Sequence, residues 1–215
     1  PKTSSAASDV YKRQSKCKRL FNFRKKNISE NPDWFNAPVP NFGELNSTLL
    51  IVGLAPGLKG ANKTGRPFTG DYAGDLLYKT LEKFGFSNDL YHGMLNDGLR
   101  LYNCSITNAV KCVPPQNKPV SEEIKNCNQF LKLTIENHKN LKVIIALGLV
   151  AHNSVLSALC LKQKLYKFKH GSEHKLKDLT LIDSYHCSRY NTNTGRLNEK
   201  MFKEVFLKAK NEIET

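Results

Sequence analysis

Two short segments hold the side chains best suited to chemistry. A glycine-rich stretch carries Phe68 and Asp71. A later segment carries His186, Ser188 and Arg189. Each segment follows a strand-like apolar run, and the loops that leave the carboxyl ends of parallel strands line a common crevice. An aromatic ring can stack on a base, a carboxylate can position water, and an imidazole can stabilise negative charge. We therefore expect a site that handles a nucleic-acid base.

The composition is that of a globular, basic protein. The chain has 215 residues, of which 40% are hydrophobic, enough for one domain with a buried core. Lys and Arg number 33 against 19 Asp and Glu, which gives a net charge of +14. This excess favours polyanion binding, although solubility alone is an alternative explanation. Because no apolar run approaches the length of a membrane span and no signal peptide opens the chain, we expect a cytoplasmic protein with no membrane partner.

The six cysteines favour free thiols or metal ligands over a disulfide framework, because the chain shows no secretion signal. Cys112 and Cys127 flank a Pro-Pro loop, and Cys17 lies in a basic N-terminal stretch. Thiolates from distant parts of a chain can hold an iron–sulfur cluster, but small buried core residues are the alternative. Cys104 and Cys160 have apolar neighbours in the sequence, so we expect them in the core.

The first 14 residues, PKTSSAASDVYKRQ, are small, polar and aperiodic. They resemble the translation of a sequencing-adapter remnant, and an ordinary disordered tail is the alternative. We therefore exclude residues 1–14 from the fold and expect a single domain over residues 15–215.

Strand-like and helix-like segments alternate along the rest of the chain. We expect residues 15–47 to be irregular and Ser121 to cap a helix that begins with Glu122 and Glu123. Strands are predicted at 48–53, 105–110, 142–148 and 179–182, and further helices at 73–84, 149–161 and 198–213. This alternation predicts an α/β fold: one three-layer αβα domain with a central, four-stranded, mostly parallel sheet.

Residues 57–64 approach a phosphate-binding P-loop but depart from it. Asn62 stands where that motif needs glycine, and the loop runs on to Asp71 instead of opening a helix at Thr64. A nucleotide-hydrolysing site is therefore disfavoured. Among the histidines, His186 is the strongest candidate for function, and we expect structural roles for the others: His92, His138, His152, His170 and His174.

From about Cys17 to its end, the chain resembles the uracil-DNA glycosylase superfamily, and within it the iron–sulfur-containing type 5 branch. Six colinear segments carry the resemblance: GLAPG at 53–57, GANKTGRPFTGDYAG at 60–74, ITNAVKCVPPQNKP at 106–119, EEIKNC ending at Cys127, ALG at 146–148 and SYHCSRYNTNTGRL at 184–197. The type 4 branch has an acidic residue where this chain has Leu54, and most relatives have proline where it has Cys187.

The resemblance implies an enzyme that flips uracil, and deaminated bases of undetermined range, out of DNA and hydrolyses the N-glycosidic bond. It implies that Asp71 positions or activates water, His186 stabilises the leaving base anion, Phe68 stacks on the base and Asn108 reads its edge. The other substrate-binding residues that it implies are Gly53, Leu54, Ala55, Pro56, Ser188 and Arg189. We expect a monomer associated with the nucleoid through DNA.

The resemblance also implies a structural [4Fe-4S] cluster held by Cys17, Cys112 and Cys127. The fourth ligand of the family falls at position 14, where this chain has Gln14. A non-catalytic, nucleic-acid-binding iron–sulfur protein of the same fold is the alternative function, although it would be expected to lose Asp71 or His186. A thiol or electron-transfer protein is disfavoured, because the chain has no Cys-x-x-Cys pair.

Overall fold

The computed structural model describes residues 16–94 and 96–215. The atypical leader and the expected ligand position at Gln14 lie outside these residues. Among the described residues, no helix has both the length and the apolar character needed to cross a lipid bilayer.

Four apolar segments form the centre of the sheet, as predicted. They are β2 (Leu49–Gly53), β3 (Cys104–Asn108), β4 (Val143–Leu147) and β6 (Thr180–Ser184), and every residue in them is buried. Neighbouring strands run parallel in the order β3-β2-β4-β6, with Val52 opposite Thr107 on one side and Ala146 on the other. Strands that are covered on both faces have continuous apolar sequences, and these four strands could therefore be predicted from the sequence.

Two short antiparallel strands extend the sheet to six strands. β1 (Phe42–Gly43) pairs with β3, and β5 (Glu173–Lys175) pairs with β6. Neither was expected, because β1 has only two residues and β5 is polar. The predicted four-stranded parallel centre is confirmed, and the edge strands are an addition to it.

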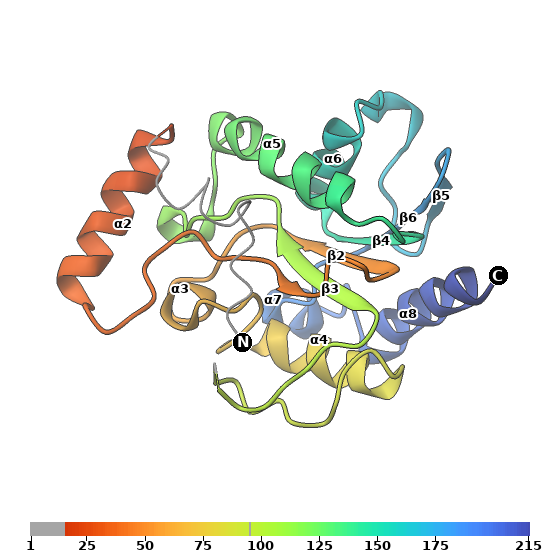
Figure 1. The fold of residues 1–215 in the computed structure, drawn as a ribbon, viewed down its shortest axis with the longest axis horizontal. Coiled ribbons are helices and arrows are strands. Elements are labelled where there is room, and N and C mark those ends of the chain that lie inside the picture. The colour runs from red at the N-terminus through yellow and green to blue at the C-terminus, as the bar shows by residue number, and fades with distance from the viewer. Residues whose placement is uncertain (1–15, 95) are drawn as a thin grey trace.

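Helices cover both faces of the sheet, which gives the three layers seen in Figure 1. α4 (Tyr72–Lys83) and α8 (Glu199–Glu214) pack on one face, and α5 (Ser121–Asn137) and α6 (Leu149–Ala158) pack on the other. Alternate residues of β2 pack into the two cores, because successive side chains of a strand point to opposite faces of the sheet. Leu49 and Ile51 join the first core, whereas Leu50 and Val52 join the second.

Three sequence predictions are wrong. Residues 15–47 are not irregular throughout, because α2 (Lys18–Glu30) forms there; its many charges hide a short apolar side that buries Leu20. Ser121 does not cap α5: Val120 is the cap residue, and its N–H donates to the carboxylate of Glu123 at 2.9 Å. Cys160 is exposed rather than part of the core, whereas Cys104 is buried as expected.

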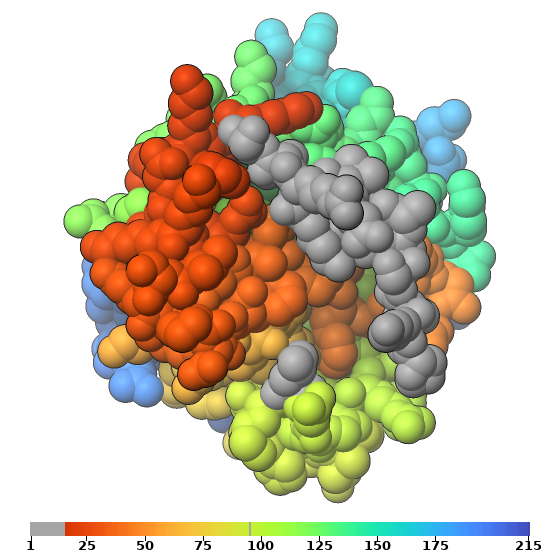
Figure 2. Space-filling model, turned by 60° about the vertical axis from the view of Figure 1, so that its left-hand side comes forward, coloured from red at the N-terminus to blue at the C-terminus, as the bar shows by residue number. Residues whose placement is uncertain are grey.

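The remaining elements are short and lie in the connections. They are α3 (Ala61–Thr64), the 3-10 turns η1 (Pro115–Asn117) and η2 (Gln163–Leu165), and α7 (Arg189–Asn193). Figure 2 shows α2 and the segment after it along one side of the molecule, with the connection between α4 and β3 projecting at the lower edge.

Candidate active site

A cavity of about 500 Å³ opens where β2, β3 and β6 end. Because these strands are parallel, their carboxyl ends bring distant segments to one edge of the sheet, the usual place for a ligand site in such folds. Of the residues expected in the site, all but Gly53 line this cavity: Leu54, Ala55, Pro56, Phe68, Asp71, Asn108, His186, Ser188 and Arg189.

Gly53 lies directly behind the cavity wall. A Cβ atom added to it would lie 2.4 Å from Oδ1 of Asn108 and 2.7 Å from Cζ of Phe68. Such distances are impossible for a real side chain, so any larger residue at position 53 would displace the amide and the ring. Glycine here allows Asn108 and Phe68 to lie side by side against β2.

His186 faces Phe68 across the site. The two ring centroids are 5.9 Å apart, and the ring planes differ by 25°. Burial lowers the pKa of His186 to about 4, so its imidazole is neutral at neutral pH. Asn191 donates a hydrogen bond to the carbonyl of His186 at 2.8 Å, and the thiol of the buried Cys187 donates to the carbonyl of Ala73 at 3.4 Å. These two bonds hold the carbonyl of His186 and the side chain of the residue that follows it.

Asp71 is the N-cap of α4. Its Oδ1 accepts a hydrogen bond from the N–H of Gly74 at 3.0 Å. Burial raises the pKa of Asp71 above its ordinary value, and the Gly74 bond opposes this effect only in part. Cβ atoms added to Gly57 and Gly60 would lie 3.5 and 3.6 Å from its Oδ2. Asp71 is exposed at the cavity, but its carboxylate is desolvated on the side backed by peptide groups and is more basic than a free aspartate.

Six further residues, which were not expected from the sequence, line the cavity: Gly57, Ala61, Gly70, Tyr72, Ala73 and Asn117. Tyr72 follows Asp71 directly, and the guanidinium of Arg189 lies 5.6 Å from the centroid of its ring. Asn117 comes from η1, in the connection between β3 and α5, and has a left-handed backbone with φ of 56°. No strand ends just before Asn117, so a search limited to strand ends could not find it.

The three cysteines expected to bind metal lie together and do not line this cavity, although Ala55 of the cavity wall packs against their cluster. Cys17 precedes α2, Cys112 follows β3, and Cys127 lies in α5; all three belong to one apolar cluster with Leu20 and Phe130. Burial raises the pKa of Cys112 to about 12, and it also raises those of Cys17 and Cys127. Without a metal these thiols are neutral.

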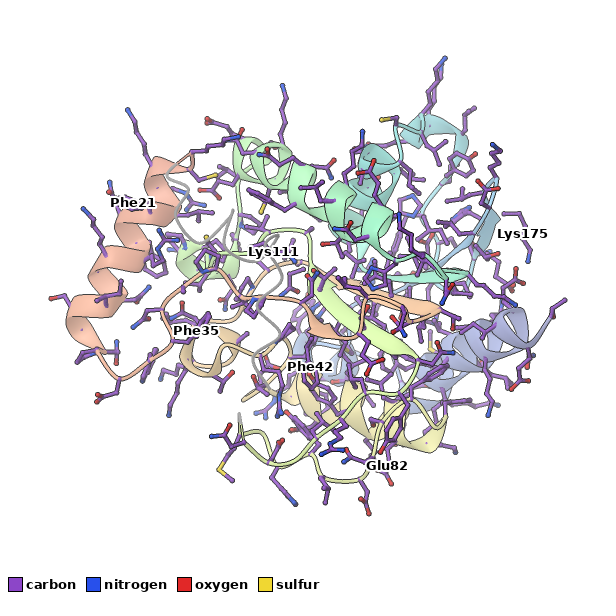
Figure 3. All side chains as sticks on the ribbon, viewed as in Figure 1. Phe21, Phe35, Phe42, Glu82, Lys111 and Lys175 are labelled. Atoms are coloured by element: carbon purple, nitrogen blue, oxygen red, sulfur yellow. The ribbon has the colours of Figure 1, made fainter. Side chains whose placement is uncertain are left out.

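Each of the three sulfurs has a hydrogen-bond donor. The N–H of Lys111 donates to Cys127 at 3.3 Å, Arg24 donates to Cys112 at 3.8 Å, and Asn126 donates to Cys17 at 3.7 Å. Figure 3 shows Lys111 in the space between α2 and the sheet. Donors aimed at sulfur, a nearby guanidinium and an apolar shell suit thiolates that bind a metal cluster.

A second polar cluster lies among α6, β5 and β6, outside the cavity. Asp183 accepts hydrogen bonds from Nδ1 of His152 at 2.6 Å and from Nε2 of His174 at 2.8 Å. Nε2 of His152 donates to the carbonyl of Tyr166 at 2.9 Å. Burial alone would lower the pKa of His152, but Asp183 raises it. These three ligand-type side chains lie within 4.8 Å of one another, yet they already bond one another directly.

Comparison with known proteins identifies the family. Residues 40–210 match the family model described as the uracil DNA glycosylase superfamily. The chain is 41% identical over 188 residues to a type-5 uracil-DNA glycosylase of Thermus thermophilus, covering 87% of this chain and 85% of that protein. A type-5 enzyme of Pyrobaculum aerophilum is 38% identical over 199 residues, with coverage of 91% and 87%.

A type-4 uracil-DNA glycosylase of Sulfurisphaera tokodaii is also similar, with 30% identity over 178 residues that cover 78% of this chain and 72% of that protein. The alignments with the two type-5 proteins are therefore longer and have higher identity than the alignment with this type-4 protein. The fold, the family-model match and the extent of these alignments agree, and the chain belongs to the uracil-DNA glycosylase superfamily.

Proposed function

We propose that this protein is a monofunctional uracil-DNA glycosylase that hydrolyses the N-glycosidic bond and leaves an abasic site. The observation that carries the proposal is one cavity that gathers Asn108 from the end of β3 with Phe68, Asp71 and His186 from the segments that follow β2 and β6. Its relatives named type-5 uracil-DNA glycosylases support the same activity. The net charge of +14 suits a DNA substrate.

Base recognition is assigned to Phe68 and Asn108. A flipped base needs a flat apolar surface and polar groups that match its edge. Phe68 supplies the ring, and the Asn108 amide can donate to O4 of uracil and accept from N3–H. The cavity walls that would enclose the base include Leu54, Ala55 and Pro56, backed by Gly53.

Bond cleavage is assigned to His186 and Asp71. As the C1′–N1 bond breaks, negative charge develops on the base and positive charge on the sugar. The neutral imidazole of His186 can donate a hydrogen bond to O2 of uracil, and its burial strengthens that interaction. Asp71 can orient or activate the attacking water and offset the sugar's charge, and its raised pKa makes it a better proton acceptor.

The rim of the cavity is assigned to the DNA strand. Arg189 is exposed beside Tyr72, and its guanidinium can bind a phosphate of the flipped nucleotide. Ser188 lines the cavity next to it and caps α7, accepting a hydrogen bond from the N–H of Asn191. We propose that the protein acts in the cytoplasm as a monomer. Size-exclusion chromatography with light scattering would measure its oligomeric state.

We propose a [4Fe-4S] cluster on Cys17, Cys112 and Cys127, whose shared apolar surroundings and sulfur-directed donors fit such a group. When bound, the cluster would supply a structural cross-link between α2 and the segments on either side of η1. The proposed position of the fourth ligand is Gln14, from the sequence resemblance alone. The chain as it stands is then expected to hold little iron, and Gln14→Cys to restore about four irons with absorption near 400 nm.

The activity is tested with oligonucleotides that carry uracil, hypoxanthine or thymine opposite each base, using Gln14→Cys and unaltered protein. Alkali cleaves abasic sites, so strand breaks that appear at uracil only after alkali indicate a monofunctional glycosylase. Tight binding without any alkali-sensitive site would instead favour the alternative, a non-catalytic nucleic-acid-binding protein. Which of the three bases is released also sets the range of substrates.

A further inference from the structure

The backbone of Phe68 adopts a conformation that few bulky residues tolerate. Its φ is 56°, in the left-handed region. Such a conformation is costly for a residue with a Cβ and persists only where neighbouring groups enforce it. The ring is nevertheless held within 25° of parallel to His186. The groups that enforce this backbone are therefore candidates for positioning the ring.

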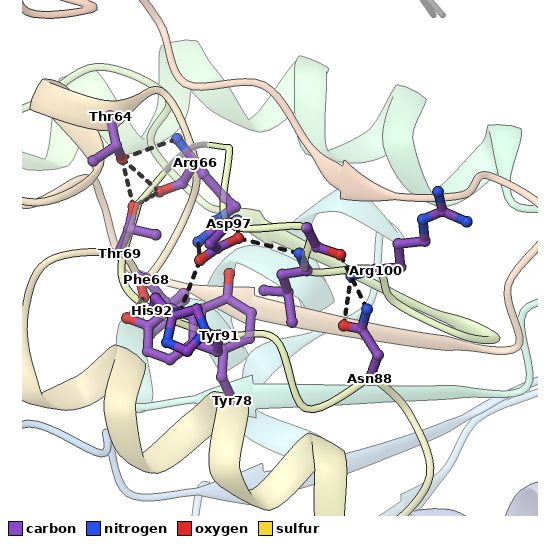
Figure 4. A network of polar contacts seen from close by, with 12 residues as sticks. Thr64, Arg66, Phe68, Thr69, Tyr78, Asn88, Tyr91, His92, Asp97 and Arg100 are labelled. Atoms are coloured by element: carbon purple, nitrogen blue, oxygen red, sulfur yellow. Dashed lines mark hydrogen bonds and ion pairs between the residues drawn. The ribbon is translucent and has the colours of Figure 1, made fainter.

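Two tyrosine hydroxyls hold the backbone around Phe68. Tyr78 donates a hydrogen bond to the carbonyl of Pro67 at 2.6 Å, and Tyr91 donates to the carbonyl of Phe68 at 3.3 Å. The backbone of Gly70 lies near the same hydroxyl and lowers the pKa of Tyr91, which burial raises to about 12. The Tyr91 hydroxyl therefore lies against the turn that contains Phe68. Figure 4 shows the tyrosine rings lying together beneath this turn.

The tyrosine rings are themselves fixed by a buried ion pair. Tyr78 and Tyr91 stack with centroids 4.4 Å apart, and the guanidinium of Arg66 lies 5.7 Å from each. Asp97 binds Arg66 through two hydrogen bonds of 2.8 and 2.7 Å, and their side chains are 0% and 3% exposed, respectively. Asp97 lies in the connection between α4 and β3, and it also accepts a hydrogen bond from the N–H of Leu99 in the same connection at 3.1 Å (Figure 4).

Glycine at position 74 is part of the same arrangement. A Cβ atom there would lie 1.9 Å from the carbonyl oxygen of Phe68 and 2.8 Å from the hydroxyl of Tyr91. The first turn of α4, which Asp71 caps, is therefore pressed directly against the hydrogen bond that holds Phe68. Displacing the Tyr91 hydroxyl removes a hydrogen bond from the backbone that carries the stacking ring.

We propose that Tyr91 is a positioning residue for base excision, acting through its hydroxyl on the backbone of Phe68. The Arg66–Asp97 pair holds Tyr91 in place from behind. This inference rests on the proposed function of Phe68 as the ring that stacks on the flipped base. Tyr91 itself is not assigned any contact with the base.

The test is a comparison of Tyr91→Phe with Tyr102→Phe, a matched loss of one hydroxyl from the same connection at a side chain that is 50% exposed. Single-turnover release of uracil is expected to slow about 10-fold in Tyr91→Phe and to stay within about 2-fold of the unaltered protein in Tyr102→Phe, since a misplaced catalytic or binding group costs on that order. Equal rates in the two variants would overturn the proposal.

A double-mutant cycle separates positioning from general stability. In a Phe68→Leu background, removing the Tyr91 hydroxyl is expected to change the rate less than 2-fold, because the ring that it positions is gone. The same 10-fold loss in both backgrounds would refute the proposed route through Phe68. Should Tyr91→Phe not fold, Tyr78→Phe takes its place with the same expectations. The same substitutions are made in the Gln14→Cys protein; if that protein, loaded with iron, releases no uracil at all, the proposed function fails, and this inference fails with it.

Discussion

The neutral state of His186 can be tested through the dependence of stability on pH. Burial lowers its pKa from 6.5 to about 4. At about 1.4 kcal/mol for each pKa unit, the folded protein disfavours protonation of this ring by about 3 kcal/mol. Because the folded-state pKa lies below the unfolded-state value, this contribution to stability is complete above pH 6.5 and is lost as the pH falls to about 4.

The assay compares urea unfolding of the unaltered protein with that of His186→Gln at pH 7 and pH 4. Burial also lowers the pKa values of His138 and His170, and both variants share that effect, so only the difference between them reports on position 186. The stability of the unaltered protein relative to the variant is expected to fall by about 3 kcal/mol between the two pH values. NMR titration of the ring gives the pKa directly. A ring that titrates near 6.5, with no change in the stability difference, would refute the reasoning.

Three other variants test separate parts of the structure. Asp71→Asn is expected to slow uracil release by on the order of 10²–10⁴ without loss of stability, because asparagine caps a helix as well as aspartate does; near-normal release would exclude Asp71 from the chemistry. Asp97→Asn is expected to lower the free energy of unfolding by about 3–5 kcal/mol, because it leaves the Arg66 guanidinium buried without its counter-ion; a loss below about 1 kcal/mol would contradict this. In the Gln14→Cys protein, Cys112→Ser is expected to remove the iron whereas Cys104→Ser retains it, as measured by iron content and absorbance; retained iron in both would move the cluster elsewhere.

The sequence located the elements whose burial imposes a simple pattern. β2 and β4 are continuous apolar runs because helices cover both of their faces, and the amphipathic α4 and α8 follow from their helical spacing. α2 escaped detection because its charged residues interrupt the apolar pattern, and only Leu20 and Asn27 are buried. Its place depends on contacts with distant segments, such as the ion pair of 2.8 Å between Arg19 and Glu123.

The residues of the site also divide into those that could be predicted from the sequence and those that could not. Residues at strand ends, such as Asn108 and His186, could be anticipated because parallel strands deliver their carboxyl ends to one edge of the sheet. Asn117 could not, because it reaches the cavity through a turn with two left-handed residues. Nor could the support of Phe68 by Tyr91, which joins residues 23 apart in sequence through one hydroxyl. Long-range contacts of this kind leave no periodic signal in a single sequence.

We propose that this cavity hydrolyses the bond between uracil and deoxyribose. Its most direct test is the intact mass of a uracil-containing oligonucleotide after incubation with the Gln14→Cys protein in ¹⁸O-labelled water. Hydrolysis would give free uracil and an unbroken strand that has lost the base and gained one labelled oxygen at the abasic sugar. A substrate of unchanged mass with U·G, U·A and single-stranded DNA alike, from a protein shown to be folded and loaded with iron, would contradict it.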